Sequence, residues 1–370
     1  MVLDRLPLTY DECRARFRMS CADAGFDVEA HAIDATGPEG QQLSVDAAMI
    51  GVGPPDRALI VMSGVHGVEG YIGSAMQCDL IDRLRSSPLP DGVAVLLLHA
   101  VNPWGMAWWR RQNESNVDLN RNWNRERIEP PSNPGYEEVH PFLCPDTPEM
   151  PTPESFLDRS RVLVEQQGMA WIQAAVSGGQ YTHPDGLYFG GDRTEESTRI
   201  VASVVAERLG GVASSFCVDL HTGHGAPGTY TILSDSPPGS ELDGWLATHF
   251  EAERIEATVD NPGATTAHKV GQIGHGLAEI LPSSTHRSVT LELGTVSDTR
   301  MVLAGRAENW VHHHGDRGSA EGRAAVWANR LCYTPDDPAW AHQSLAHGRA
   351  VLDTALRSVV GASGERERGT

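Results

Sequence analysis

The chain has 370 residues, of which 40% are hydrophobic and 21% are charged, as in ordinary globular proteins. Its formal net charge of −20 at pH 7 repels phosphate backbones and anionic lipid, so we expect no nucleic-acid and no membrane partner. The first ten residues lack a basic start followed by an apolar run, and no stretch is apolar enough to span a membrane. The six scattered cysteines form no CxxC pair, so we predict a cytoplasmic protein with reduced thiols.

The predicted elements alternate between strands and helices along the chain. Alternating residues predict strands at 28–34 and 41–50, and short apolar runs predict buried strands at 58–63, 93–99, 215–220 and 289–293. Helical patterns cover residues 9–25, about 71–85, about 160–177, 194–209, 300–313 and 339–359. This alternation is typical of an α/β fold with a mostly parallel or mixed central sheet, flanked by helices on both faces.

Two segments lack such a pattern. Residues 124–160 are rich in Pro, Glu and Asn, and we expect an irregular insertion there, because loops of this length are usually functional or mobile. The polar residues from about 362 onward are expected to fray. No internal repeat and no linker is evident, so we predict a single domain over residues 1–370. The oligomeric state stays open, with a homo-oligomer as one alternative.

A histidine and a glutamate directly follow the predicted strand at 58–63. In Ser63-Gly-Val-His-Gly-Val-Glu-Gly70, His66 and Glu69 stand three residues apart in a turn that enters a helix. His221 follows another buried strand, and open α/β sheets build their sites at the carboxyl ends of strands. Catalytic zinc commonly takes three such protein ligands and one water. We therefore predict one zinc ion per chain, held by these three residues.

A cluster of arginines lies downstream, in Trp108-Trp-Arg-Arg-Gln-Asn-Glu-Ser-Asn-Val-Asp-Leu-Asn-Arg-Asn-Trp123. It brings together Arg110, Arg111, Asn120 and Arg121, and the flanking tryptophans indicate a partly buried segment. Buried guanidinium groups need anionic or carbonyl partners. Beside a zinc ion, these groups suit a substrate carboxylate and a developing oxyanion. The alternative interpretation is a solvated charged loop.

Glu292 lies inside the apolar strand segment Thr290-Leu-Glu-Leu-Gly-Thr295. A buried charge is costly unless it has a partner or a role, and a structural ion pair is the alternative to a catalytic role. Near zinc, a carboxylate can accept the proton of a bound water whose pKa falls from about 16 to about 7, and a positioned base adds roughly 10²–10⁴-fold to the rate. We predict that Glu292 is the catalytic carboxylate of a zinc-dependent hydrolase.

Each of these features is weak by itself. An isolated His-x-x-Glu occurs by chance in many proteins, the chain has 16 histidines, and the helical HExxH motif is absent. Two alternatives stay open: a catalytically inactive zinc-binding protein, and an esterase or lactonase that uses the same site. Retention of Glu292 and of the arginines argues against the inactive protein, because zinc binding requires neither.

Together and in this order, these blocks resemble the M14 zinc carboxypeptidase superfamily, and most closely its bacterial DUF2817 group. The resemblance covers most of the chain, including residues 179–191. It implies a zinc carboxypeptidase-like α/β fold in one catalytic domain. It also implies zinc ligands at His66, Glu69 and His221 and a general base at Glu292.

The resemblance also implies roles for the arginine block. The pair that grips the terminal carboxylate of the substrate falls on Asn120 and Arg121. The arginine that polarises the scissile carbonyl falls on Arg111 or on Arg110, depending on the alignment. The expected substrate is therefore a small molecule or short peptide that bears a carboxylate, cleaved at an adjacent amide bond.

One departure from the superfamily pattern bears on the substrate. The carboxypeptidases carry a tyrosine shortly before the catalytic glutamate, and here only Tyr230 lies between the last zinc histidine and that glutamate. This departure favours an N-acyl amino acid or another small amide over peptide trimming. We expect His224 and Tyr188 to contact the substrate. Asp219 is a candidate partner of His221, with a plain structural role as the alternative.

Overall fold

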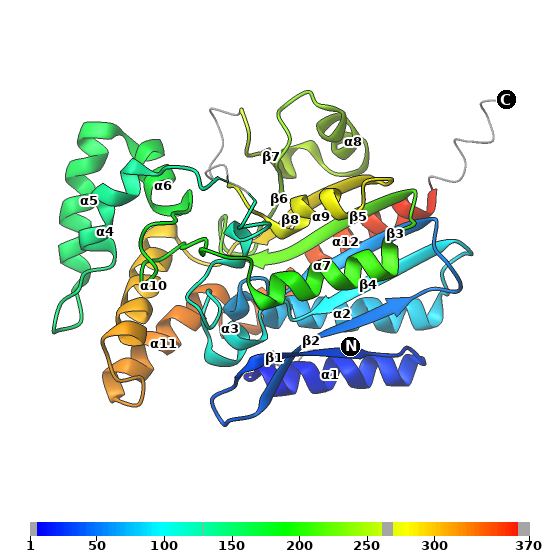
Figure 1. Cartoon of the computed structure of the whole chain (residues 1–370), viewed down its shortest axis with the longest axis horizontal. Coiled ribbons are helices and arrows are strands. Elements are labelled where there is room, and N and C mark those ends of the chain that lie inside the picture. Colours follow the sequence, from blue (N-terminus) through cyan, green and yellow to red (C-terminus); the bar gives the residue numbers. More distant parts are fainter. Residues whose placement is uncertain (1–5, 128, 261–268, 362–370) are drawn as a thin grey trace.

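The computed structural model describes residues 6–127, 129–260 and 269–361. Within these residues, eight strands form one sheet in the order β1-β2-β4-β3-β5-β8-β6-β7 (Figure 1). The strands are β1 (Glu29–Thr36), β2 (Gln42–Ile50), β3 (Arg57–Ser63), β4 (Val93–His99), β5 (Ser214–Thr222), β6 (Tyr230–Ser234), β7 (Ile255–Ala257) and β8 (Thr285–Leu293). The central strands β4, β3, β5 and β8 are parallel, whereas β2 and β6 pair with them in the antiparallel direction. The predicted α/β fold with a mixed sheet is confirmed.

Helices bury both faces of the central strands. Along β3, Leu59 and Val61 face one apolar core, whereas Ile60 and Met62 face the other. The first face is covered by α1 (Tyr10–Ala24), α2 (Gly70–Ser86) and α12 (Pro338–Gly361), and the second by α7 (Glu196–Leu209) and α9 (Ile273–Ile280). Burial on both faces explains why the central strands read as continuous apolar runs in the sequence.

A further group of helices gathers at one end of the molecule (Figure 1). Its members are α4 (Pro134–Leu143), α5 (Pro153–Gln167), α6 (Met169–Ser177), α10 (Asp298–His313) and α11 (Ala320–Tyr333). The helices α4, α5 and α6 share a small apolar core, against which Val302 and Leu303 of α10 pack. This group forms a wall of the cavity described below.

The expectation of an irregular insertion at 124–160 is wrong for much of that segment, because α4 and the start of α5 lie within it. Pro134 and Pro153 each stand in the first turn of a helix, where a missing backbone N–H costs nothing. The side chain of Asn133 caps α4. Asn133, Pro134 and Pro153 therefore mark helix starts within this segment.

The remaining differences concern short elements. The helix predicted at 160–177 is two helices, separated by Gly168 in a conformation with φ of 90°. The sequence patterns missed β6, β7, α9 and α11, as well as α3 (Pro103–Trp108) and α8 (Glu241–His249). The fraying expected from about 362 lies outside the described residues. None of the described helices is long and apolar enough to cross a membrane.

Candidate metal centre

A tight turn places His66 and Glu69 directly beyond the carboxyl end of β3. The turn is one 3-10 helix that leads into α2. It requires Gly67, because a Cβ at this position would lie 2.1 Å from the backbone of Gly105. Its amides donate to the carbonyl oxygens of residues 110–111 at 2.8 and 3.3 Å. The turn and the arginine block are therefore held side by side.

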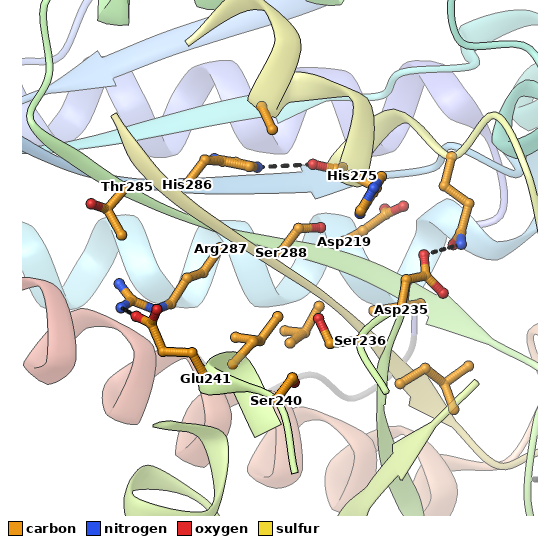
Figure 2. A pocket seen from close by; sticks show the side chains of 17 residues that line it. Asp219, Asp235, Ser236, Ser240, Glu241, His275, Thr285, His286, Arg287 and Ser288 are labelled. Atoms are coloured by element: carbon orange, nitrogen blue, oxygen red, sulfur yellow. Dashed lines mark hydrogen bonds and ion pairs between the residues drawn. The ribbon is translucent and has the colours of Figure 1, made fainter. Parts of the chain in front are cut away.

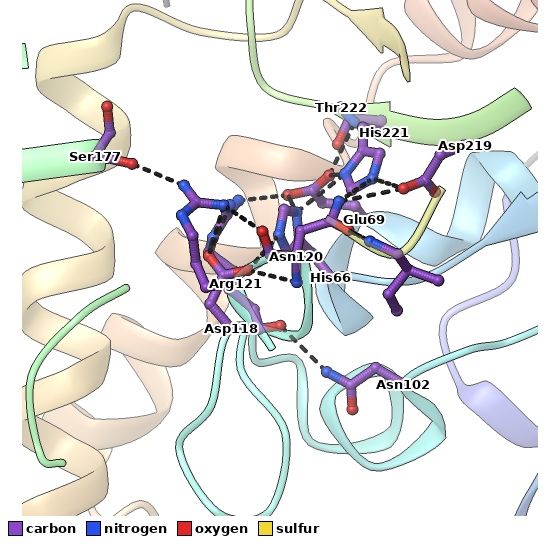
Figure 3. A network of polar contacts seen from close by, with 12 residues as sticks. His66, Glu69, Asn102, Asp118, Asn120, Arg121, Ser177, Asp219, His221 and Thr222 are labelled. Atoms are coloured by element: carbon purple, nitrogen blue, oxygen red, sulfur yellow. Dashed lines mark hydrogen bonds and ion pairs between the residues drawn. The ribbon is translucent and has the colours of Figure 1, made fainter. Parts of the chain in front are cut away.

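The three predicted zinc ligands converge in the structure (Figure 3). The Nδ1 atoms of His66 and His221 lie 3.0 Å apart. Each of these nitrogens also lies 2.9 Å from a carboxylate oxygen of Glu69. All three side chains are buried. Residues that are 155 positions apart thus form one compact group, with His221 supplied by β5.

Two buried aspartates hold the outer nitrogens of the two imidazole rings. Asp118 Oδ1 lies 3.0 Å from Nε2 of His66, and Asp219 Oδ2 lies 2.7 Å from Nε2 of His221. An ionised carboxylate only accepts hydrogen bonds, so Asp118 and Asp219 favour a proton on each Nε2, which would leave each Nδ1 free to ligate a bound ion. Asp219 lies where it was expected, whereas Asp118 was not identified from the sequence.

This donor set fits zinc. The Nδ1 atoms of His66 and His221 and the carboxylate of Glu69 face one another at 2.9–3.0 Å, so one cation among them would contact all three groups. Zinc bonds of about 2.0 Å at tetrahedral angles place the ligand atoms about 3.3 Å apart, so the group needs to open by only a few tenths of an ångström. Two histidines and one glutamate would leave a fourth position for water or substrate.

Arg111 contacts the same group of side chains. Its Nη1 donates to Glu69 at 2.9 Å, and its Nε and Nη2 donate to one oxygen of Asp118 at 3.3 and 3.2 Å. Arg110 points elsewhere, because its fully buried guanidinium donates to Glu308 at 3.0 Å. Arg111 is therefore the arginine beside the three predicted zinc ligands, and the choice between Arg110 and Arg111 for polarising a scissile carbonyl stays a prediction that this geometry favours for Arg111.

The structure separates the two members of the Asn-Arg pair. The buried Arg121 borders a cavity, where its Nη2 donates to the carbonyl of Ser177 at 2.7 Å and its Nε has no partner among the described residues. Asn120 turns toward Asp219, and its amide nitrogen lies 3.2 Å from the carboxylate (Figure 3). Arg121 is thus placed to bind an anion. The direct substrate contact of Asn120 stays a prediction, and in this structure its side chain contacts Asp219, the partner of His221.

A cavity of 260 Å³ brings most of the other predicted residues together. Of the predicted catalytic and substrate-binding residues, it is lined by Arg111, Arg121, Tyr188, His224 and Glu292. Lys269 adds a further cation, and Tyr333 borders the cavity at the end of α11. Apolar side chains of α5, α6 and α10 complete the wall. The cavity therefore has a charged end and an apolar side.

Glu292 stands beside the metal ligands on the neighbouring strand. It is the register partner of His221 in the parallel pair β5 and β8, which puts both side chains on one face of the sheet. Its Oε2 is buried and has no hydrogen-bond partner among the described residues. Among the described residues, Glu292 also has no ion pair. The alternative in which Glu292 forms a structural ion pair therefore finds no support there.

A family model described as "Protein of unknown function (DUF2817)" matches residues 7–347. The chain belongs to this family. The DUF2817 resemblance predicted from the sequence is therefore confirmed. No curated protein matches the chain.

The DUF2817 chain is also similar to several solved structures. Carboxypeptidase A from Helicoverpa armigera has 15% identity and a TM-score of 0.46, over 88% of this chain and 74% of that chain. Bovine thrombin-activatable fibrinolysis inhibitor has 13% identity and a TM-score of 0.46, over 93% and 97% of the two chains. A metallo-carboxypeptidase from Pseudomonas aeruginosa has 14% identity and a TM-score of 0.43, over 93% and 70%.

Lys269 is the cavity residue whose sequence signal was overlooked. It belongs to no motif, but it is the only lysine among the 29 lysine and arginine residues of this DUF2817 protein. Burial lowers its pKa, repulsion from Arg121 adds to this effect, and attraction to Glu292 opposes it. Because Lys269 is the only lysine in the sequence, a count of residue types could have singled it out as a candidate.

Asp118 links the metal ligands to both cavity arginines. Burial alone would raise the pKa of this carboxyl group, but attraction to Arg121, Arg111 and His66 outweighs burial and holds the pKa well below its ordinary value. Asp118 is therefore an anion at neutral pH. It fixes the orientation of His66 and compensates the buried arginines.

Replacing Asp118 with Asn is expected to weaken zinc binding about 10–100-fold, the usual effect of removing a partner of a metal-bound histidine. The amide keeps the volume of the side chain but removes the charge that holds His66 in one tautomer. Chelator competition measures the zinc affinity. Asp192→Asn, at an exposed aspartate, is the control that should leave it unchanged. Unaltered affinity in Asp118→Asn would contradict the role assigned to Asp118.

Two further features lie outside this group of residues. A second cavity, of 350 Å³, adjoins Asp219 and is lined mostly by polar side chains, among them Asp235 and His286 (Figure 2). None of the three zinc ligands lines it. The histidines of a second group of potential ligands, His140 and His183, stack with ring centroids 3.7 Å apart near an exposed aspartate. The buried group is the better metal centre.

Proposed function

We propose that this protein is a zinc-dependent hydrolase that cleaves an amide bond next to a carboxylate of its substrate. One observation carries the proposal. The Nδ1 lone pairs of His66 and His221 and the carboxylate of Glu69 converge within 3.0 Å, close to the unpaired buried oxygen of Glu292 on the adjacent strand. This arrangement supplies an ion site and a base beside one cavity.

The bound ion would supply the Lewis acidity that polarises a carbonyl and lowers the pKa of a water molecule. Glu292 accepts a proton from the attacking water. Arg111 donates hydrogen bonds to the carbonyl oxygen as negative charge develops on it. Its contacts with Glu69 and Asp118 hold the guanidinium in place before the reaction, so little reorganisation is needed.

The positively charged side chains that line the cavity support the proposal that the substrate bears a carboxylate. Arg121 offers an unpaired buried Nε–H, and Lys269 lines the same cavity. A carboxylate that receives two or three such charge-assisted hydrogen bonds is held firmly, because the surroundings exclude water. The overall charge of −20 does not oppose this binding, since the local charge decides it.

The apolar side of the cavity supports an apolar group in the substrate as well. Leu157 and Met169 line the cavity yet are exposed, at 36% and 57% of their surfaces. Exposed apolar side chains beside a pocket commonly mark a place where a ligand covers them. An N-acyl amino acid with an apolar acyl chain combines both chemistries, so N-octanoyl-L-alanine is a suitable assay substrate.

The proposal predicts that the zinc-loaded protein hydrolyses N-octanoyl-L-alanine and discriminates strongly against its carboxamide. Loss of a hydrogen bond to a charged group costs about 1.5–3 kcal/mol, so kcat/KM should fall about 10–150-fold for the carboxamide. In Arg121→Lys this preference should shrink, mainly through a higher KM for the free acid. Release of alanine or alaninamide measures both rates. Equal rates for the acid and the carboxamide would contradict carboxylate recognition.

A further inference from the structure

The basic residues of this chain are almost uniformly arginine. Lysine and arginine together number 29, and 28 of them are arginine. Arginine makes the surface ion pairs, the buried pair with Glu308 and both guanidinium contributions to the cavity. The single lysine, Lys269, lines the cavity beside Glu292 and Arg121. Where this chain needs only a fixed positive charge, it uses arginine.

A lysine can do one thing in such a cavity that an arginine cannot. An ammonium group releases and regains a proton at accessible pH, whereas a guanidinium group keeps its proton in proteins. Among the described residues, Lys269 makes no hydrogen bond and no ion pair, and it lines the same cavity as Glu292. Burial and the neighbouring arginines lower its pKa, which favours proton release.

We propose that Lys269 is the general acid that protonates the leaving amine. This role rests on the proposed hydrolase activity and refines its last step. When the C–N bond breaks, the Lys269 ammonium gives one proton to the departing nitrogen and becomes a neutral amine. Glu292, which took a proton from the attacking water, then returns that proton to Lys269. One water and one amide give one acid and one amine, and both side chains regain their starting states.

Other charged groups around Lys269 set the conditions for this transfer. Arg121 and Arg111 disfavour its charged form, whereas Glu292 and Asp235 favour it. The positive charge of Lys269 in turn lowers the pKa of His224, whose net shift is upward because of its bond to Glu256. Lys269 thus shares the cavity with the carboxylate of Glu292 and with two arginines.

The test compares Lys269→Arg with Lys269→Ala on the zinc-loaded enzyme. A general acid contributes roughly 10²–10⁴-fold to the rate, so both variants should lose kcat by that factor, with only a small change in KM for Lys269→Arg. A small primary amine such as methylamine should restore part of the kcat of Lys269→Ala, whereas guanidinium chloride should not. The descending alkaline limb of the kcat profile should disappear in both variants.

The opposite results overturn this role and leave the hydrolase proposal intact. Full kcat in Lys269→Arg would show that Lys269 acts only as a charge, and rescue by guanidinium would show the same. Absence of turnover in the unmodified zinc-loaded protein would instead refute the hydrolase proposal. Reductive methylation with ¹³C-formaldehyde tests Lys269 without turnover, because it labels only one side chain. A resonance that titrates at or above the ordinary lysine pKa of about 10.4 would also overturn the role.

Discussion

Replacing Glu292 with Gln is expected to leave zinc bound and to lower kcat by roughly 10²–10⁴-fold, the contribution of a positioned general base. The amide of glutamine has nearly the same shape as the carboxyl group, so the pairing of β5 with β8 should persist. It cannot take a proton from the attacking water. Hydrolysis of N-octanoyl-L-alanine, together with metal analysis of the same preparation, measures both expectations.

Asp298→Asn is the matched control for Glu292→Gln. Asp298 is an exposed carboxylate that lines the same cavity, and it lies on α10, away from the paired strands. Its replacement should change kcat no more than a few-fold. Normal turnover in Glu292→Gln would refute the base assignment. Loss of zinc in that variant would show that Glu292 serves the metal site and not the attacking water.

The parts of the site that could be predicted are those fixed by local sequence. His66 and Glu69 are three residues apart, so one turn is enough to bring them together, and the buried strand before them shows where that turn lies. His221 and Glu292 lie at the ends of strands whose apolar runs were evident, and parallel pairing makes them neighbours. The positions of these residues follow from the periodicity of the strands and from the tendency of open α/β sheets to build their sites at the carboxyl ends of the strands.

The parts that could not be predicted depend on side-chain direction. Arg110 and Arg111 are adjacent, yet one lies in a buried ion pair with Glu308 and the other contacts the metal ligands. Their roles are set by which elements pack on either side of the chain, and the sequence of the block does not show this. Asp118 was overlooked for the same reason, because an aspartate among arginines reads as an ordinary ion-pair partner.

Composition misled the prediction at residues 124–160. Proline and asparagine occur both in loops and at the first positions of helices, and only their spacing relative to apolar residues separates the two cases. Here Pro153 starts α5, on which Phe156 and Leu163 face the small core of this helical group. The segment predicted to be a loop therefore contributes Phe156 and Leu157 to the apolar side of the cavity.

His221→Ala is expected to abolish zinc binding and, with it, all turnover. His221 supplies one of three ligand atoms, and the two that remain do not make a complete catalytic zinc site. The substitution also leaves Asp219 and Glu69 without their shared partner at the end of β5. Inductively coupled plasma analysis should find about one zinc per unmodified chain and almost none in the variant. His224→Ala, a cavity histidine outside the ligand group, should retain its zinc.

Zinc removal tests the same site through stability. A zinc ion held by His66, Glu69 and His221 stabilises the native state, because only the folded chain brings the three ligand atoms together. A ligand that binds only the folded chain stabilises it by about 4 kcal/mol at a concentration of roughly 1,000 times its Kd. Added zinc should therefore raise the Tm of the chelator-treated protein by several degrees and leave the Tm of His221→Ala unchanged. An equal rise in both would place the bound ion elsewhere in the protein and would remove the basis of the hydrolase proposal.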